Sequence, residues 1–152
     1  MKMINILFLV IVKKLILNNM PLGIRHIEIL VSNLNLSVEF YTKLFSLVGW
    51  EQVDATGFKY GDTKIYLKES VFTKRNSENE QRNMLGSRHM CFNASDLKMV
   101  EAVGKFLNEH GTKIIRGPLE VKDDWHPKGG YHTVDFYDPD GYILEVAYKE
   151  NK

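Results

Sequence analysis

The sequence predicts an α+β domain in which two copies of one βαβββ unit form a curved mixed sheet around a concave cavity. The first observation is an internal repeat. Gly-Ile-Arg-His at residues 23–26 returns as Gly-Ser-Arg-His at residues 86–89, an offset of 63 positions. The second is that each copy continues with the same succession of one helical and three strand patterns. The 152 residues suit one domain of this kind.

The first copy spans residues 22–70. Alternating apolar residues predict a strand over residues 24–31. Asn33 or Asn35 is placed to cap a helix that continues to about Val48. Glycines then separate three short apolar segments, which predict strands at residues 50–54, 58–60 and 64–69.

The second copy spans residues 86–149 and follows the same order. Residues 88–94 predict a strand, and Asp96 is placed to cap a helix from Leu97 to about His110, which Gly111 would close. Three further strands are expected at residues 112–116, 131–137 and 142–148.

Two other segments carry no periodic pattern. The polar residues 71–85 are typical of a linker between the copies. Residues 117–130 contain prolines and glycines, so we expect an irregular stretch there. Because long loops in compact domains are often functional, this stretch is a candidate lid over a substrate site.

The N-terminal tail, residues 1–20, stands apart from the domain of residues 21–152. Its apolar run from Ile4 to Val12 is far shorter than the ~20 residues that span a bilayer, and no cleavage signal follows it. Three interpretations remain open. The tail is an upstream translation start with Met20 as the native one, an extra element packed on the domain or a partner chain, or a weak membrane-surface helix.

The composition narrows the class of protein. Hydrophobic residues make up 44% and charged residues 26%, as in ordinary soluble domains, and the formal net charge is +1. Without a field of one sign, we expect no nucleic-acid partner and no membrane partner for the domain. The single cysteine, Cys91, allows no internal disulfide and no Cys-based metal site, and it fits a reducing compartment such as the cytoplasm.

Strand alternation places both repeat histidines on a polar face. In the first strand, His26 and Glu28 are on one face, and the alternate residues form an apolar face on the other side. In the matching strand, His89, Cys91 and Asn93 lie opposite Met90, Phe92 and Ala94.

The last hairpin can be put in register from its turn. Asp138-Pro139-Asp140-Gly141 fits a type I turn, which sets Asp135 opposite Glu145. A shift by one residue would put Glu145 among apolar side chains. By the same rule, Tyr66 takes the place of Glu145 in the first copy. The predicted polar face gathers His26, Glu28, Tyr66, His89, Cys91, Thr133, Asp135 and Glu145.

This face contains a candidate metal site. Two neutral imidazoles, His26 and His89, and the carboxylate of Glu145 suit a divalent first-row metal with open positions for substrate. A single strand histidine is usually structural or exposed, which is the alternative interpretation. Two histidines at equivalent repeat positions, with a carboxylate on the same face, favour the metal.

Three segments resemble the vicinal oxygen chelate superfamily, which holds glyoxalase I, extradiol dioxygenases, and fosfomycin- and bleomycin-resistance proteins. They are residues 25–29 (Arg-His-Ile-Glu-Ile), 88–92 (Arg-His-Met-Cys-Phe) and 136–145 (Phe-Tyr-Asp-Pro-Asp-Gly-Tyr-Ile-Leu-Glu), and the resemblance covers residues 22–149. It implies metal ligands at His26, His89 and Glu145. It also implies one divalent ion (Fe, Mn, Zn or Ni), a small substrate chelated through two adjacent oxygens, and a homodimer.

One position departs from glyoxalase I. That enzyme has a fourth protein ligand, usually a carboxylate, at the place of Tyr66. A phenol is normally protonated near neutral pH and is a poor substitute. The three-ligand pattern therefore resembles the dioxygenase and fosfomycin-resistance branches more closely.

The other polar residues receive provisional roles. We expect Glu28 or Asp135 to move a proton after burial raises their pKa values, or else to orient a histidine. Cys91 is expected to be a small buried filler rather than a reactive thiol. The expected substrate-binding residues are Tyr66, Cys91, Trp125, Tyr131 and Thr133, with His126 beside them at the mouth of the site.

A function of another class also fits the sequence. The domain would then be a metal-free module that sequesters an aromatic or cationic small molecule, as the bleomycin-resistance branch does. A third hypothesis is a structural relic without a ligand. The presence of all three ligand types weighs against the metal-free module.

Overall fold

The computed structural model describes residues 23–71 and 87–150. It confirms the α+β class and the two βαβββ units. The expectations for the tail (1–20) and, apart from Val71, the linker (71–85) lie outside the described residues. The first unit contains β1 (His26–Val31), α2 (Leu34–Leu47), β2 (Glu51–Gln52), β3 (Gly57–Tyr60) and β4 (Thr63–Glu69). The second contains β5 (Met90–Asn93), α4 (Leu97–Glu109), β6 (Ile114–Val121), β7 (Tyr131–Tyr137) and β8 (Ile143–Lys149).

Both helices begin at the caps that the sequence indicates. The side chain of Asn33, and not that of Asn35, accepts a hydrogen bond from the Leu36 N–H at 3.0 Å. Asp96 accepts one from the Met99 N–H at 2.9 Å. Each cap satisfies one of the backbone donors that a helix N-terminus leaves unpaired. No helix in the described part of the chain is long and apolar enough to cross a membrane.

The strands form two four-stranded sheets with the same plan. The orders are β1-β4-β3-β2 and β5-β8-β7-β6, and the first pair of each is parallel while the others are antiparallel. The predicted register of the last hairpin is confirmed, because Asp135 lies opposite Glu145. Tyr66 pairs with Glu28 as Glu145 pairs with Cys91, so Tyr66 and Glu145 hold equivalent positions.

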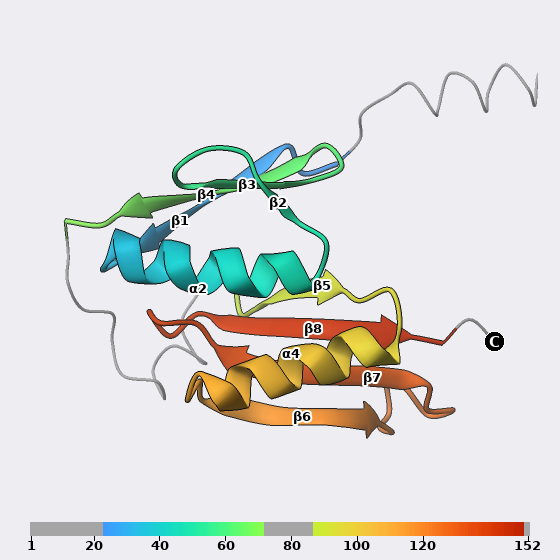
Figure 1. Ribbon diagram of the computed structural model, residues 1–152. Helices are drawn as coiled ribbons and strands as arrows, with labels where there is room; N and C mark the ends of the chain where they lie inside the picture. Colours follow the sequence, from blue (N-terminus) through green and yellow to red (C-terminus); the bar gives the residue numbers. More distant parts are fainter. Residues whose placement is uncertain (1–22, 72–86, 151–152) are drawn as a thin grey trace, which may run out of the picture.

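The single curved sheet around one cavity is not formed within one chain. Helix α2 lies between the first sheet and the second unit, and both sheets turn an apolar face toward a shared core (Figure 1). The Phe45 ring of α2 lies 5.0 Å from Phe58 of β3 and 5.4 Å from Phe92 of β5. Burial of both apolar faces in this core turns the polar faces outward. β1 and β5 consequently remain edge strands of separate sheets.

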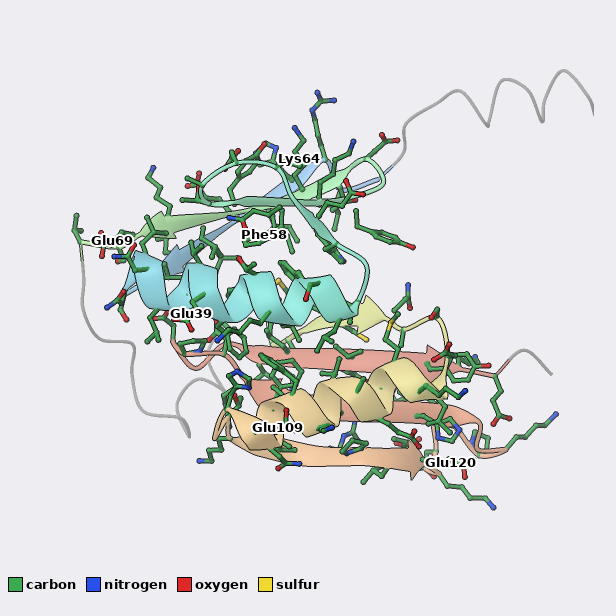
Figure 2. The ribbon with its side chains drawn as sticks, viewed as in Figure 1. Glu39, Phe58, Lys64, Glu69, Glu109 and Glu120 are labelled. Carbon is green, nitrogen blue, oxygen red and sulfur yellow. The ribbon has the colours of Figure 1, made fainter. Side chains whose placement is uncertain are left out.

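The two faces of the first sheet are visible in its side chains. Phe58 points from β3 toward α2, whereas Lys64 points away from the helix (Figure 2). Phe58 is 1% exposed, and its β4 neighbour Ile65 is equally buried. Strand alternation thus keeps one face for the core and exposes the other.

The turn between β7 and β8 joins the two units. Asp140 accepts hydrogen bonds from the Ser32 N–H at 2.8 Å and from the Ser37 hydroxyl at 3.0 Å. The fully buried Tyr41 donates to Asp138 at 2.8 Å. These bonds tie a turn of the second unit to the start of α2, so the units form one packed body.

The irregular stretch predicted for residues 117–130 is shorter than expected. β6 continues to Val121, with register shifts between Ile114 and Arg116 and between Arg116 and Leu119. Proline has no N–H to donate to a ladder, which accounts for an interruption near Pro118 and for the predicted strand being too short. A Cβ on Gly104 of α4 would overlap Pro118 Cγ, so this glycine allows the helix to lie directly on β6.

Candidate functional site

The second sheet holds a buried carboxylate beside a histidine. Glu145 is 6% exposed, and its Oε1 accepts a hydrogen bond from the Tyr131 hydroxyl at 2.8 Å. Thr133 Oγ1 lies 2.9 Å from the same oxygen. Glu145 Oε2 lies 3.1 Å from His89 Nε2, whose side chain is 39% exposed. One Glu145 oxygen is therefore fixed by two hydroxyl groups, and the other contacts the His89 imidazole nitrogen.

Tyr131 and Thr133 were expected to bind substrate, and in this structure they contact Glu145. Both lie on β7, which pairs with β8. Their side chains are on the same face of the sheet as that of Glu145. Burial, and next the hydrogen bond to Glu145, raises the pKa of the Tyr131 phenol, so it stays protonated and continues to donate. Because a buried carboxylate is costly without hydrogen bonds, these two hydroxyls stabilise Glu145 in one orientation.

Asp135 lies next to this group but is already paired. Its side chain is 16% exposed and lies 2.7 Å from Arg116 Nε, which donates a hydrogen bond to it. Thr133 Oγ1 lies 2.9 Å from the other Asp135 oxygen, and its one proton serves either Asp135 or Glu145 at a time. The sequence pattern did not indicate Arg116 as a site residue, because its strand was expected to end there and no pattern paired it with β7.

The prediction that Cys91 is buried is wrong. Cys91 is exposed, because β5 is an edge strand and its polar face is open. Partial burial, and next the Glu145 carboxylate, raises the pKa of its thiol to about 11. The Cys91 sulfur lies 3.8 Å from the Tyr131 hydroxyl. A thiol with so high a pKa is protonated near neutral pH, which agrees with the expectation that it is not a reactive nucleophile.

A pocket of about 400 Å³ lies over His89 and Glu145. The His126 ring stacks on Tyr131 with centroids 4.1 Å apart, and His126 Nδ1 lies 3.1 Å from Asp123 Oδ1. Trp125 also lines the pocket and is 88% exposed. Trp125 and Tyr131 thus line one pocket, and their contact with a substrate stays a prediction. Asp123 was missed, although its spacing of three residues from His126 is a recognisable turn signal.

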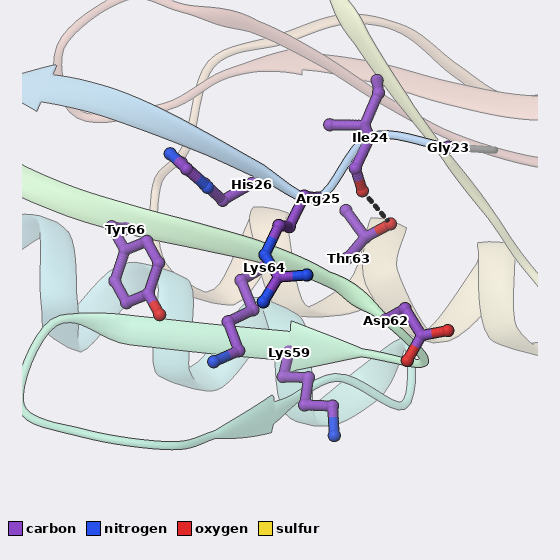
Figure 3. A pocket seen from close by; sticks show the side chains of 9 residues that line it. All are labelled: Gly23, Ile24, Arg25, His26, Lys59, Asp62, Thr63, Lys64 and Tyr66. Carbon is purple, nitrogen blue, oxygen red and sulfur yellow. Dashed lines mark hydrogen bonds between the residues drawn. The ribbon is translucent and has the colours of Figure 1, made fainter. Parts of the chain in front are cut away.

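His26 lines a different pocket, on the first sheet. This pocket has a volume of about 760 Å³, and the His26 and Tyr66 rings meet edge to face with centroids 6.1 Å apart (Figure 3). Tyr66 lies over Gly57, where a Cβ would come within 2.8 Å of the Tyr66 ring. The absence of a side chain at residue 57 leaves room for this ring on the polar face.

Glu28 is on the predicted face but is not buried. Its side chain is 55% exposed and lies 3.8 Å from Lys68 Nζ. The expected burial of Glu28 is absent because β1 is an edge strand with no neighbour beyond it. In a single chain, Glu28 is therefore a surface carboxylate with a weak ion pair.

The candidate metal ligands are divided between the two pockets. Within residues 23–71 and 87–150, no group of three His, Cys, Asp or Glu side chains lies close enough to hold a metal ion. His89 and Glu145 form a ready pair of one nitrogen and one oxygen donor, while His26 lies in the other pocket. The donor types fit a divalent first-row metal, and the pair needs at least one further ligand.

Comparisons with known proteins agree with this architecture. Residues 23–146 match the sequence profile of the Glyoxalase/Bleomycin resistance protein/Dioxygenase superfamily. No curated protein sequence matches the chain.

Solved structures with the same fold come from several bacteria. A glyoxalase/dioxygenase from Nostoc punctiforme has a TM-score of 0.67 and 19% identity, covering 86% of this chain and 92% of its own. A glyoxalase/bleomycin resistance protein from Albidiferax ferrireducens T118 has a TM-score of 0.62 and 15% identity, covering 82% and 97%. Lactoylglutathione lyase from Agrobacterium tumefaciens has a TM-score of 0.55 and 20% identity, covering 84% and 94%. At these identities the likeness shows the fold alone.

Proposed function

Because this chain belongs to the Glyoxalase/Bleomycin resistance protein/Dioxygenase superfamily, we propose that it is a divalent-metal-dependent enzyme. Its substrate is a small molecule with two adjacent oxygen atoms, and its reaction is a lyase or isomerase reaction, a dioxygenation or a group transfer. The observation that carries this proposal is the buried Glu145 carboxylate beside His89, with one oxygen held by hydroxyls and the other at the nitrogen.

The third ligand, His26, would come from a second copy of the chain. β1 and β5 are both edge strands, and edge strands are templates for pairing with another chain. If β1 of one copy lies beside β5 of another, the polar faces of the two sheets become continuous. His26 of the partner subunit then joins His89 and Glu145, and a homodimer holds two such sites.

The residues of the chain have separate roles in this proposal. When bound, the metal would act as a Lewis acid that stabilises negative charge on the two substrate oxygens. Tyr131 and Thr133 keep Glu145 in its ligating orientation. Asp135, oriented by Arg116, would accept or return the substrate proton, and Glu28 of the partner subunit is the other carboxylate that would reach the joined face.

A complementation experiment tests the shared site. Protein without a metal-chelating tag is purified as wild type, as His26→Ala and as His89→Ala, and bound metal is measured by elemental mass spectrometry. We expect about one metal per chain in the wild type and almost none in either variant. When the two variants are refolded together, roughly a quarter of the wild-type metal should return, since half of the dimers are mixed and each mixed dimer keeps one intact site.

Each outcome decides a different part of the proposal. If the mixture stays empty while the wild type binds metal, the ligands come from one chain and the shared site is wrong. If the wild type binds none of Fe, Mn, Zn or Ni, the enzyme hypothesis fails. A double variant, His110→Ala with His132→Ala, removes two histidines outside the site and should keep its metal.

A metal-free binding module is the second candidate function. The stacked His126 and Tyr131 rings, with the exposed Trp125 beside them, favour binding of a flat aromatic molecule. This function predicts no metal in the wild type and saturable quenching of tryptophan fluorescence by a planar aromatic ligand. Loss of that quenching in Trp125→Phe would support it.

A further inference from the structure

The pocket on the first sheet is rich in positive charge. Arg25, Lys59 and Lys64 line it, and Asp62 is the one carboxylate among its lining residues. Figure 3 shows these three basic side chains extending over the same face of the sheet. Arg25 directly precedes β1, Lys59 lies on β3 and Lys64 lies on β4, so three separate segments supply the charge.

Two of these cations are held directly opposite each other. Lys59 and Lys64 are register partners on antiparallel strands, an arrangement in which like charges repel. His26 is the register partner of Lys64 on its other side. Among the described residues, no carboxylate forms an ion pair with Arg25, Lys59 or Lys64. Glu51 of β2 is the register partner of Lys59 on its other side, but among the described residues it forms no ion pair with this lysine. The Lys59–Lys64 repulsion is unfavourable for folding, and a bound anion would offset it.

The carboxylates of the other pocket do not neutralise this charge. Asp135 is paired with Arg116, and Glu145 is held by hydroxyls beside His89. Asp123 accepts hydrogen bonds from the turn that contains His126. If the two pockets meet in a dimer, these acids are already engaged and do not serve as counter-ions for the three cations.

We propose that Arg25, Lys59 and Lys64 bind a dianionic oxyanion, such as a phosphate group, carried by the small-molecule ligand. The guanidinium of Arg25 offers a planar fork of donors that matches an oxyanion, and the two ammonium groups add point charges from the neighbouring strands on the same face. Since His26 lines the same pocket, the anionic end of the ligand lies beside the proposed metal ligand. The inference rests on the proposed function only in treating this anion as part of the substrate.

Titration with inorganic phosphate tests the anion site in the metal-free full-length protein. Isothermal titration calorimetry at low salt should show saturable binding of about one phosphate per chain. Lys64→Gln should weaken it by about tenfold or more, because a hydrogen bond to a charged group is lost. Lys98→Gln removes the same charge from the exposed surface of α4 and should leave the affinity unchanged.

Thermal unfolding is measured to check that each variant is folded. Lys64→Gln should not destabilise the protein, since it relieves the Lys59–Lys64 repulsion. Absence of saturable phosphate binding in the wild type would overturn the inference, as would equal weakening in Lys98→Gln. Acetate that binds as tightly as phosphate would reject a dianion. Metal content is measured separately, so failure of the metal site and failure of the anion site give different results.

Discussion

The two sheets share a plan but carry different chemistry at matched positions. Tyr66 on β4 and Glu145 on β8 occupy equivalent register positions. Glu145 is buried and held by Tyr131 and Thr133 of the neighbouring strand, whereas the neighbour of Tyr66 on β3 is Gly57. The repeat therefore supplies the same backbone positions in both sheets. The residues on the adjacent strand decide whether such a position holds a fixed carboxylate or an aromatic ring in a basic pocket.

The helices differ in the same way. Tyr41 of α2 and Gly104 of α4 are related by the repeat offset, and both are buried. Tyr41 fills the space between the units and reaches Asp138, while Gly104 leaves room for Pro118. Tyr41 therefore joins the two units, whereas Gly104 allows α4 to lie close to its own sheet.

The largest expected contrast lies at the matched positions Glu145 and Tyr66. Glu145→Gln should weaken metal binding by more than about 100-fold, because even partners outside the ligand shell are worth 10–100-fold. Tyr66→Phe should leave metal binding nearly unchanged, since Tyr66 supplies no ligand in the proposed site. Competition with a fluorescent chelator measures both affinities. Equal losses in the two variants would remove the distinction between the sheets.

The second contrast concerns the helix positions. Gly104→Ala should lower the free energy of unfolding by about 1–3 kcal/mol, because the added methyl group overlaps Pro118 and overpacks the contact between α4 and β6. This loss outweighs the gain of about 1 kcal/mol that alanine brings to a helix interior. Urea unfolding measures the change, with Lys105→Ala on the exposed face as the control. An increase in stability in Gly104→Ala would show that the helix can move away from the strand without cost.

The smallest expected effect is a pH dependence at the turn that joins the units. Burial raises the pKa of Asp138 to about 6, despite hydrogen bonds from Tyr41 and Tyr142 that oppose this. In the unfolded chain the pKa is about 3.9. Between pH ~4 and about 6, the folded state thus keeps the Asp138 carboxyl protonated while the unfolded chain loses that proton. The contribution of Asp138 to the free energy of unfolding is therefore complete below pH ~4 and is lost as pH rises to about 6.

Asp138→Asn should remove this contribution. The difference in unfolding free energy between wild type and variant should change by at most about 1.4 kcal/mol per pH unit within that window, and stay constant above it. Urea unfolding across the pH range isolates the effect, because other titrating groups contribute equally to both proteins. Parallel curves for the two proteins would show that Asp138 does not titrate in this window.

Local patterns were sufficient to predict where both helices begin and how the last hairpin pairs. The caps at Asn33 and Asp96 follow from side chains that satisfy helix donors, and the pairing of Asp135 with Glu145 follows from one turn. Both depend on residues close in sequence. The exposure of Cys91 and the extension of β6 were not predicted, because each depends on which strand has a neighbour and on how far the pairing continues past a proline.

The two βαβββ units and the polar and apolar face of each strand follow from the sequence alone, and so do the residue types of the proposed metal site. Only the tertiary structure decided that the two sheets share one core through α2 and that His26 lies in a different pocket from His89 and Glu145. The physical reason is that strand alternation is set by neighbouring residues along the chain. The direction in which a polar face points is set by where the opposite, apolar face is buried.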